Sequence, residues 1–288
     1  MALLSAESNI KGWVFIMLTD FHIHSTCSSD AHDKMADMAL ASYDRGVRLM
    51  CFTDHVDLDN YSTGRADEHC FDVWPEILRQ HAETCAAVPA DMEVRCGIEL
   101  GQGNHDLARA EQIASTDGLD FVIGSLHNLR DTPDFSVLRY ISMSDCRQYL
   151  ALYVSELLEL SHLDFYDVMA HIGYTRRYML RDGFDLPLTM QNYGDELDTI
   201  FRHLIQNGRG IEMNCSGLRN PGIHDTIPSF SVIKRYRELG GEIITIGSDA
   251  HCTADASVGC ERGYELLREA GFEYVTVFKQ RKPEFIKI

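Results

Sequence analysis

Residues 20–24 read Asp20-Phe21-His22-Ile23-His24 and follow a short apolar run. Successive side chains of a strand point to opposite faces, so His22 and His24 project to the same side and can bind one metal ion. Ile23 then faces the other way, into a core. A pair of this kind also occurs in ordinary cores, so its meaning depends on whether other segments repeat the pattern.

Six later apolar runs are also followed by residues of the types that bind metals. The runs, each given with the residues that follow it, are 47–52 with Thr53-Asp54-His55, 94–98 with Glu99, 121–123 with Gly124-Ser125-Leu126-His127, 165–170 with His171, 211–213 with Asn214-Cys215-Ser216-Gly217, and 243–246 with Gly247-Ser248-Asp249-Ala250-His251. Neutral imidazole suits zinc, iron or manganese, and carboxylates bridge ions or balance their charge. The recurrence therefore indicates a multinuclear metal site at strand ends.

The segments between these runs have the features of helices. They carry apolar residues at helical spacing or helix-boundary signals, and they are residues 34–43, 75–87, 144–161, 193–206, 230–239 and 257–270. Strand and helix thus alternate in an α/β chain, in about seven or eight units. Right-handed crossovers between such units predict a closed or nearly closed, TIM-like (β/α) barrel. The candidate ligands then lie at the C-terminal ends of its strands.

Length and composition predict one domain. The chain has 288 residues, 45% of them hydrophobic, and no Pro/Ser-rich linker or repeat divides it. We expect an N-terminal extension, residues 1–17, followed by a single domain over 18–288, and translation could start at Met1 or Met17. The apolar run Trp13-Val14-Phe15-Ile16 is too short for a membrane span. Nine cysteines without CxxC spacing indicate reduced thiols and a cytoplasmic protein.

The charge of the chain argues against some partners. A formal net charge of −18 disfavours nucleic acid, which needs Lys and Arg to neutralise its phosphates. A small phosphorylated substrate stays possible, because three divalent ions would bring about +6 against about −3 from three carboxylate ligands. Arg176, Arg177, Asn214 and Arg219 follow the predicted strand ends and are candidate substrate-binding residues. Each of these arginines could equally form a surface ion pair.

The ordered motifs resemble those of a known family. They are DFHIHS (20–25), FTDH (52–55), GIELG (97–101), GSLHN (124–128), AHIGYTRRY (170–178), EMNCSGLRNP (212–221) and GSDAH (247–251). The set resembles the PHP (polymerase and histidinol phosphatase) superfamily and, within it, the histidinol-phosphate phosphatases. The similarity extends from Asp20 to the closing TVFKQRKP (276–283). It implies a distorted, seven-stranded (β/α) barrel that holds three divalent ions, commonly zinc, iron or manganese.

The resemblance also implies which residues bind the ions. The implied ligands are His22, His24, Glu99 and Asp249 for the first ion, Glu99, His127 and His171 for the second, and Asp30, His55 and His251 for the third. Many relatives have a histidine at the place of Asp30, so a carboxylate there suggests a harder or more weakly held ion. Asp20 and Asp54 would support the site by accepting the second N–H of ligand imidazoles.

The implied reaction is hydrolysis of L-histidinol phosphate to L-histidinol and phosphate, a step of histidine biosynthesis. A metal-bridged hydroxide would attack phosphorus, with Glu99, Asp249 and His251 as the catalytic residues around it. Two alternatives stay open: a PHP phosphoesterase for another small ester, such as a nucleotide or sugar phosphate, and a non-catalytic metal-binding barrel. We expect the histidines outside the pattern to be surface or capping residues, and segments 56–72 and 179–191 to be solvated loops.

Overall fold

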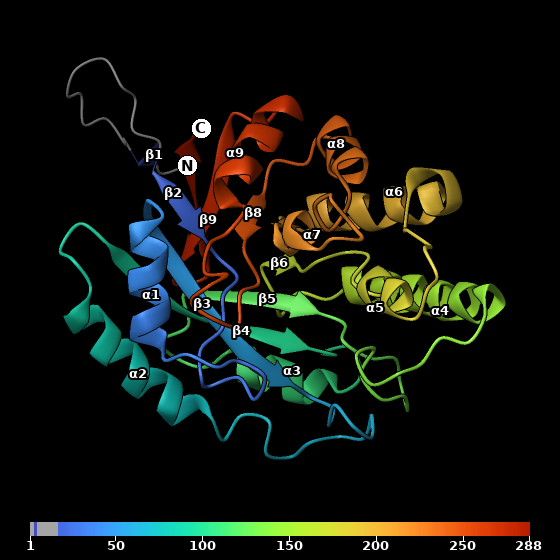
Figure 1. The fold of residues 1–288 in the computed structure, drawn as a ribbon, viewed down its shortest axis with the longest axis horizontal. Helices are drawn as coiled ribbons and strands as arrows, with labels where there is room; N and C mark the ends of the chain where they lie inside the picture. Colours follow the sequence, from blue (N-terminus) through green and yellow to red (C-terminus); the bar gives the residue numbers. More distant parts are fainter. Residues whose placement is uncertain (1–2, 5–16) are drawn as a thin grey trace.

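The computed structural model describes residues 3–4 and 17–288, and its centre is a parallel sheet of seven strands (Figure 1). The strands are β2 (Leu18–Asp20), β3 (Val47–Asp57), β4 (Glu93–Gly101), β5 (Phe121–Ser125), β6 (Val168–Met169), β7 (Gly210–Asn214) and β8 (Ile244–Gly247). Their order in the sheet is their order in the chain. The strands that the apolar runs predict are all present, although β3 continues five residues beyond the predicted run.

The first and last strands of this sheet approach each other. Phe21 N donates to Ile246 O at 2.8 Å, Asp249 N donates to His22 O at 2.7 Å, and His24 N donates to Ala250 O at 3.0 Å. These bonds join the segment that follows β2 to the end of β8 and the residues after it, and they bring His22 and His24 beside the GSDAH motif. The sheet is therefore a nearly closed barrel, as the sequence predicts.

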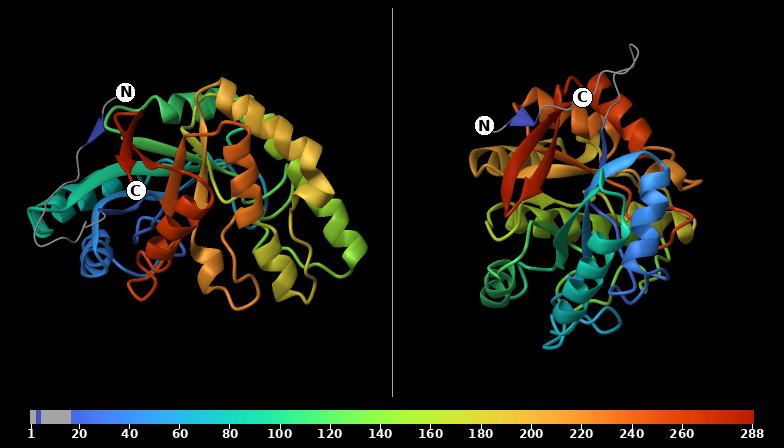
Figure 2. Two further views of the ribbon diagram at one scale, coloured as in Figure 1. Left: turned by 90° about the horizontal axis from the view of Figure 1, so that it is seen from above. Right: turned by 90° about the vertical axis from the view of Figure 1, so that its left-hand side faces the viewer.

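Helices connect the strands and surround the sheet (Figures 1 and 2). They are α1 (Met35–Asp44), α2 (Trp74–Ala87), α3 (Leu107–Ala114), α4 (Met143–Ser161), α5 (Arg176–Arg181), α6 (Met190–Gln206), α7 (Ser216–Arg219), α8 (Phe230–Glu238) and α9 (Cys260–Glu269). The six predicted helices are confirmed, with ends shifted by up to three residues. The short helices α3, α5 and α7 were not predicted, because helices of this length are too short to show the helical spacing of apolar residues.

Local hydrogen bonds explain the two largest shifts. Helix α6 begins three residues early because the side chains of Thr189 and Asn192 form a capping box at its N-terminus. Helix α9 begins three residues late because Gly259 takes a left-handed φ of 94° directly before it. The Ser257 hydroxyl, which lies in this irregular turn, donates to Asp20 Oδ2 at 2.8 Å.

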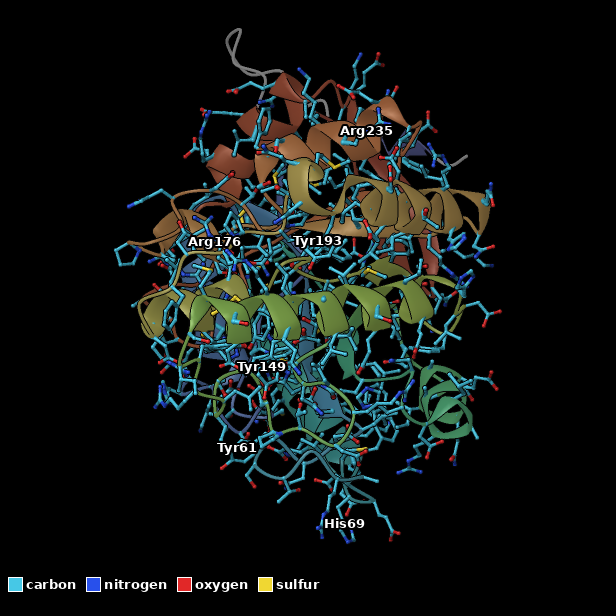
Figure 3. All side chains as sticks on the ribbon, turned by 90° about the vertical axis from the view of Figure 1, so that its right-hand side faces the viewer. Tyr61, His69, Tyr149, Arg176, Tyr193 and Arg235 are labelled. Atoms are coloured by element: carbon cyan, nitrogen blue, oxygen red, sulfur yellow. The ribbon has the colours of Figure 1, made fainter. Side chains whose placement is uncertain are left out.

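The expectation of solvated loops over 56–72 and 179–191 is wrong in part. Val56 and Leu58 are buried where β3 ends, and Met179 is buried in α5. Each is an apolar residue within a mainly polar segment, so average composition hides its role. Asp59 of the first loop is buried as well, whereas His69 of the same loop is exposed. His69 projects from one end of the molecule, and Arg235 of α8 lies near the other (Figure 3).

A second, smaller sheet lies near the N-terminal ends of the barrel strands. Strands β9 (Tyr274–Lys279) and β10 (Lys282–Lys287) form an antiparallel hairpin, and β1 (Leu3–Leu4) pairs with β10. Arg281 pairs with Asp167 at 2.5 Å, and Arg95 donates to Phe278 O at 2.7 Å. The Phe278 ring stacks on Phe121 with centroids 5.1 Å apart. The hairpin thus covers the end of the barrel opposite to the predicted ligands.

These contacts support residues 18–288 as a single domain, which we retain as a proposal. The predicted extension, residues 1–17, lies outside the described residues except for 3, 4 and 17. Within the described part of the chain, no helix has the length and apolar character needed to cross a membrane.

Candidate metal centre

The C-terminal ends of the barrel strands bring the predicted ligands together. His22 and His24 follow β2, His55 and Glu99 lie near the ends of β3 and β4, and the others follow β5, β6 and β8; these are His127, His171, Asp249 and His251. His22, His24 and Glu99 are fully buried. Residues up to 229 positions apart thus share one site, since parallel strands end at one rim of the barrel.

Glu99 lies at the centre and divides its two oxygens between two sets of histidines. Its Oε1 lies 3.0 Å from His127 Nε2 and 2.8 Å from His171 Nε2. Its Oε2 lies 3.2 Å from His22 Nε2. Burial raises the pKa of Glu99, but the charges of His22, His127 and His55 outweigh it and hold that pKa well below its usual range. A carboxylate in this position can bridge two cations.

Asp249 completes a group with the two histidines of the opening motif. Its Oδ1 lies 3.6 Å from His24 Nε2 and 4.0 Å from His22 Nε2. The backbone of Asp249 has a left-handed φ of 52°, which non-glycine residues rarely adopt. Burial raises the pKa of Asp249, but the guanidinium of Arg177, together with the neighbouring histidines, outweighs it and holds that pKa well below its usual range.

A third group lies at the more open side of the site. The rings of His55 and His251 stack on His24, with centroids 4.4 and 4.1 Å away. Asp30 lies 3.3 Å from His251 Nε2 and 3.7 Å from His55 Nε2, and 59% of its side chain is exposed. The structure therefore places Asp30 at the rim, within reach of the two histidines that the resemblance assigns to the same ion.

The donor atoms of this site fit metal ions. His22 Nε2, His24 Nε2, His55 Nδ1 and Glu99 Oε2 are buried and have no hydrogen-bond partner among the described residues. Four groups have ligand atoms within 4.8 Å of one another: His24-His55-His251, His22-Glu99-His171, His22-His24-Asp249 and His55-Asp57-His127. Buried polar atoms without partners are costly. Convergent imidazole and carboxylate donors are the ligands of zinc, iron and manganese, which would offset this cost.

Two carboxylates that the sequence did not predict contact the histidines of the site. Glu212 of β7 is fully buried; its Oε1 lies 2.8 Å from His22 Nδ1, and its Oε2 accepts from His171 N at 2.8 Å. Asp57 Oδ1 lies 2.8 Å from His127 Nδ1. Both left a signal: Glu212 is a lone charge in the apolar strand Gly-Ile-Glu-Met-Asn, and Asp57 shares a strand face with His55. Such contacts orient a ligand ring and raise its basicity.

Asp20 and Asp54 do not have the predicted contacts. Asp20 accepts hydrogen bonds from Ser248 N at 2.9 Å and from the Ser257 hydroxyl, and Asp54 accepts from Ser25 N at 2.7 Å and from the Ser28 hydroxyl at 2.7 Å. Neither is hydrogen-bonded to an imidazole within the described residues, so the predicted ring contact is wrong. Burial raises the pKa of both, that of Asp54 to about 6. They accept hydrogen bonds from backbone and hydroxyl groups in the loops that carry the predicted ligands. The residue types alone do not predict these contacts.

A cavity of about 390 Å³ opens beside the ligand cluster. It is lined by Arg177, Ser216, Arg219, Asn220, Pro221, Asp249, His251 and Asp255. Arg177 Nη2 donates to Asp249 Oδ2 at 2.9 Å and to the Ser216 hydroxyl at 2.6 Å. Arg219 donates to the carbonyl oxygens of Ser248 and Asp249 at 2.6 and 2.9 Å, which holds the left-handed Asp249 peptide in place. Two of the predicted arginines thus line the same cavity as Asp249, a predicted metal ligand.

The other two predicted substrate contacts lie elsewhere. Arg176, labelled in Figure 3, forms an ion pair with Asp185, with Nε 2.7 Å and Nη2 3.1 Å from its oxygens. Asn214 is fully buried; it donates to Glu212 and accepts from Ser216 N at 3.0 Å. Neither lines the cavity. Arg176 is therefore not part of the proposed substrate site, and Asn214 holds Glu212 and Ser216 by hydrogen bonds.

Comparisons with known proteins find relatives that are described as phosphatases. The chain is 25% identical over 262 residues to a protein of Thermotoga maritima described as "Probable histidinol-phosphatase", covering 90% of this chain and 95% of the relative. It is 23% identical to the histidinol-phosphatase of Lactococcus lactis, covering 91% and 95%. A protein of Photobacterium profundum, 25% identical with coverage of 93% and 92%, is described only as "Probable phosphatase".

The fold also matches a solved structure. The histidinol phosphate phosphatase of Lactococcus lactis, crystallised with zinc, L-histidinol and phosphate, superposes with a TM-score of 0.74 at 21% identity, covering 93% of this chain and 99% of that one. The model of the PHP domain matches residues 20–216, more than half of the chain, and this span includes the ligand positions from His22 to His171. The protein therefore belongs to the PHP domain family.

Proposed function

We propose that the protein is a metal-dependent phosphomonoesterase that hydrolyses L-histidinol phosphate to L-histidinol and phosphate. The observation that carries the proposal is the cluster of unpartnered histidine and carboxylate atoms beside a cavity lined by two arginines. Membership of the PHP family and relatives described as phosphatases support the phosphoesterase class. Relatives described as histidinol-phosphatases support the substrate. The proposal includes a cytoplasmic location and a role in histidine biosynthesis.

The proposed ligand sets are those that the family resemblance implies. His22, His24, Glu99 and Asp249 would hold one ion, Glu99, His127 and His171 a second, and Asp30, His55 and His251 a third. Divalent ions bound there would lower the pKa of a coordinated water and neutralise phosphoryl oxygens. Glu99, Asp249 and His251 are the residues that we place around the attacking oxygen.

The arginines would bind the phosphoryl group from the other side. Arg177 lines the cavity, and Nη2 is the nitrogen that binds Asp249 and Ser216, so within the described part of the chain its Nε and Nη1 groups have no hydrogen-bond partner. Each η-nitrogen of Arg219 uses one N–H for a carbonyl and keeps a second. Guanidinium groups match phosphate oxygens with charge-assisted hydrogen bonds. Fixed in this way, they would orient the phosphorus atom toward the ligand cluster.

The organic part of the proposed substrate is a cation, and the negative charge of the protein attracts cations. Asp255 lies on the cavity wall, 3.5 Å from Arg219, with about half of its side chain exposed. The net charge of −18 also attracts a positively charged group to the molecule. We expect acidic and polar groups of the surrounding loops, including the segment 56–72, to contact the amine and the imidazole.

A panel of phosphomonoesters tests the proposal. Histidinol phosphate, glycerol phosphate and adenosine monophosphate would be compared with added manganese or zinc, and we expect a much higher kcat/KM for histidinol phosphate. Equal turnover of the three, or a preference for the nucleotide, would reject this substrate in favour of another small phosphate ester. An absence of turnover with all three in the metal-loaded protein would favour the non-catalytic barrel.

A further inference from the structure

A buried ion cluster lies beside the metal centre and shares no residue with it. His105 Nδ1 lies 2.6 Å from Asp59 Oδ2, and His105 Nε2 lies 2.6 Å from Glu156 Oε2. The exposed fractions of the side chains of His105, Asp59 and Glu156 are 7%, 8% and 11%. The expectation that His105 is a surface or capping residue is therefore wrong; its neighbours in sequence are polar, and only the fold encloses it.

The cluster joins three separate parts of the barrel rim. Asp59 lies in the loop after β3, His105 lies in the loop after β4, and Glu156 belongs to α4. Each carboxylate also holds the segment that follows β5. Asn128 Nδ2 donates to Asp59 Oδ2 at 3.1 Å, and Arg130 N donates to Glu156 Oε1 at 3.0 Å. Asn128 directly follows the proposed ligand His127, and it is buried.

The positive charge of His105 stabilises the two buried carboxylates of this cluster. Burial lowers the pKa of His105, but its hydrogen bonds to Asp59 and Glu156 more than compensate, so its pKa is raised above the usual value and the charged form is favoured. Burial raises the pKa of Glu156, and the hydrogen bond from His105 reverses this effect. Without His105, two buried carboxylates would face each other without a cation between them, which is unfavourable. They would separate or take up protons, and both changes alter their contacts with residues 128 and 130.

We propose that His105 is a positioning residue for the second ion of the centre: it fixes Asp59 and Glu156, these fix residues 128 and 130, and the segment between β5 and α4 thereby presents His127 to Glu99. The distance of 3.0 Å between His127 Nε2 and Glu99 Oε1 depends on this arrangement. The inference rests on the proposed metal centre and is independent of the substrate.

The test measures metal binding in the absence of substrate. His105→Gln would be compared with the wild type and with His81→Gln, since His81 is a half-buried histidine of α2 whose Nε2 lies near Val94 O. Metal-free protein would be titrated with manganese, and bound metal would be counted after equilibrium dialysis. We expect His105→Gln to bind one equivalent about 10- to 100-fold more weakly, the usual effect of losing a residue that orients a ligand. The other equivalents and the His81→Gln protein should match the wild type.

A second variant separates positioning from general stability. Asn128→Ala leaves His105, Asp59 and Glu156 in place and removes one of the two links to the His127 segment, the other being the bond from Arg130 N to Glu156. We therefore expect the same equivalent to be weakened, by less than in His105→Gln, while the other equivalents keep their wild-type affinity. Raising the manganese concentration should restore binding in both variants. Wild-type affinity for every equivalent in Asn128→Ala and in any folded His105→Gln protein would overturn the proposal. So would a parallel loss of all equivalents together with a lower metal-free Tm.

Discussion

At the scale of single residues, the site depends on which groups the two oxygens of each carboxylate contact. Glu99 faces His127 and His171 with one oxygen and His22 with the other, whereas Glu212 connects the ring of His22 to the backbone of His171. Both side chains are fully buried. A charge in such a place is stable only if cations or hydrogen-bond donors surround it.

Glu99→Gln should remove most of the activity and at least one bound ion, because an amide offers a single neutral oxygen where two charged oxygens face two histidine sets. The loss of kcat/KM should exceed the roughly 10- to 100-fold that residues supporting a ligand contribute. The matched control is His203→Gln on α6, whose ring contacts Ser161 away from the centre. Comparable losses in both variants, with the fold intact, would show that the site is misplaced.

The adjacent arginines Arg176 and Arg177 provide a second comparison. Arg177 lines the cavity, so Arg177→Ala should weaken every phosphomonoester alike by about 1.5–3 kcal/mol, the value of a lost charge-assisted contact. Arg176 pairs with the half-exposed Asp185, so Arg176→Ala should change kcat/KM by less than about 1 kcal/mol. Steady-state kinetics on two different esters would measure both. A larger loss in Arg176→Ala would contradict our placement of the phosphate.

At the scale of elements, the pairing of β3 with β4 places a glycine where a supporting carboxylate needs room. Gly101 is the register partner of Asp57, and a Cβ atom at Gly101 would lie only 1.8 Å from Asp57 Oδ1. The carboxylate could then no longer accept from His127 Nδ1 at 2.8 Å. The small residue in the GIELG motif therefore leaves room for the carboxylate that contacts the predicted ligand His127.

Gly101→Ala should lower metal affinity by about 10- to 100-fold while leaving a folded barrel, because it displaces a group that orients His127. Gly194→Ala in α6 is the control, since its Cβ would meet Met190 only at an ordinary 3.5 Å and alanine favours a helix by about 0.5–1 kcal/mol. Metal titration and thermal unfolding of both variants would check this. Unchanged metal affinity in Gly101→Ala would mean that Asp57 does not support the ligand.

At the scale of the whole molecule, bound metal should connect parts of the chain that contribute ligands from both ends of the sheet. His22 and His24 follow the first strand of the barrel, and Asp249 and His251 follow the last. Only a few backbone hydrogen bonds join these segments directly. Ions shared between them would strengthen the closure of the barrel.

The purified protein should therefore carry more than two equivalents of transition metal, and a chelator should lower its Tm. A ligand at 100 times its Kd stabilises a protein by about 2.7 kcal/mol, which corresponds to a shift of roughly 5 °C or more. Elemental analysis and thermal unfolding before and after reconstitution would measure both. One equivalent or fewer after metal-supplemented growth, with no gain on reconstitution, would contradict a trinuclear centre.

The sequence by itself determined the alternation of strands and helices, the nearly closed barrel and the membership of His22, Glu99, His171 and the other ligand-type residues in one rim. These features are local: the predicted ligands other than Asp30 lie within about five residues of the end of an apolar run, and the ends of parallel strands meet wherever a barrel forms. The family resemblance then led to the correct superfamily.

Only the tertiary structure decided which polar groups support the site. Asp20 and Asp54 bind backbone and hydroxyl groups, whereas Glu212 and Asp57 contact the rings; Arg177 faces the cavity, but Arg176 pairs with Asp185. Adjacent residues of one type differ in role because the direction of a side chain depends on packing between distant segments. His105 is enclosed for the same reason: the burial of a polar side chain is a property of the assembled fold.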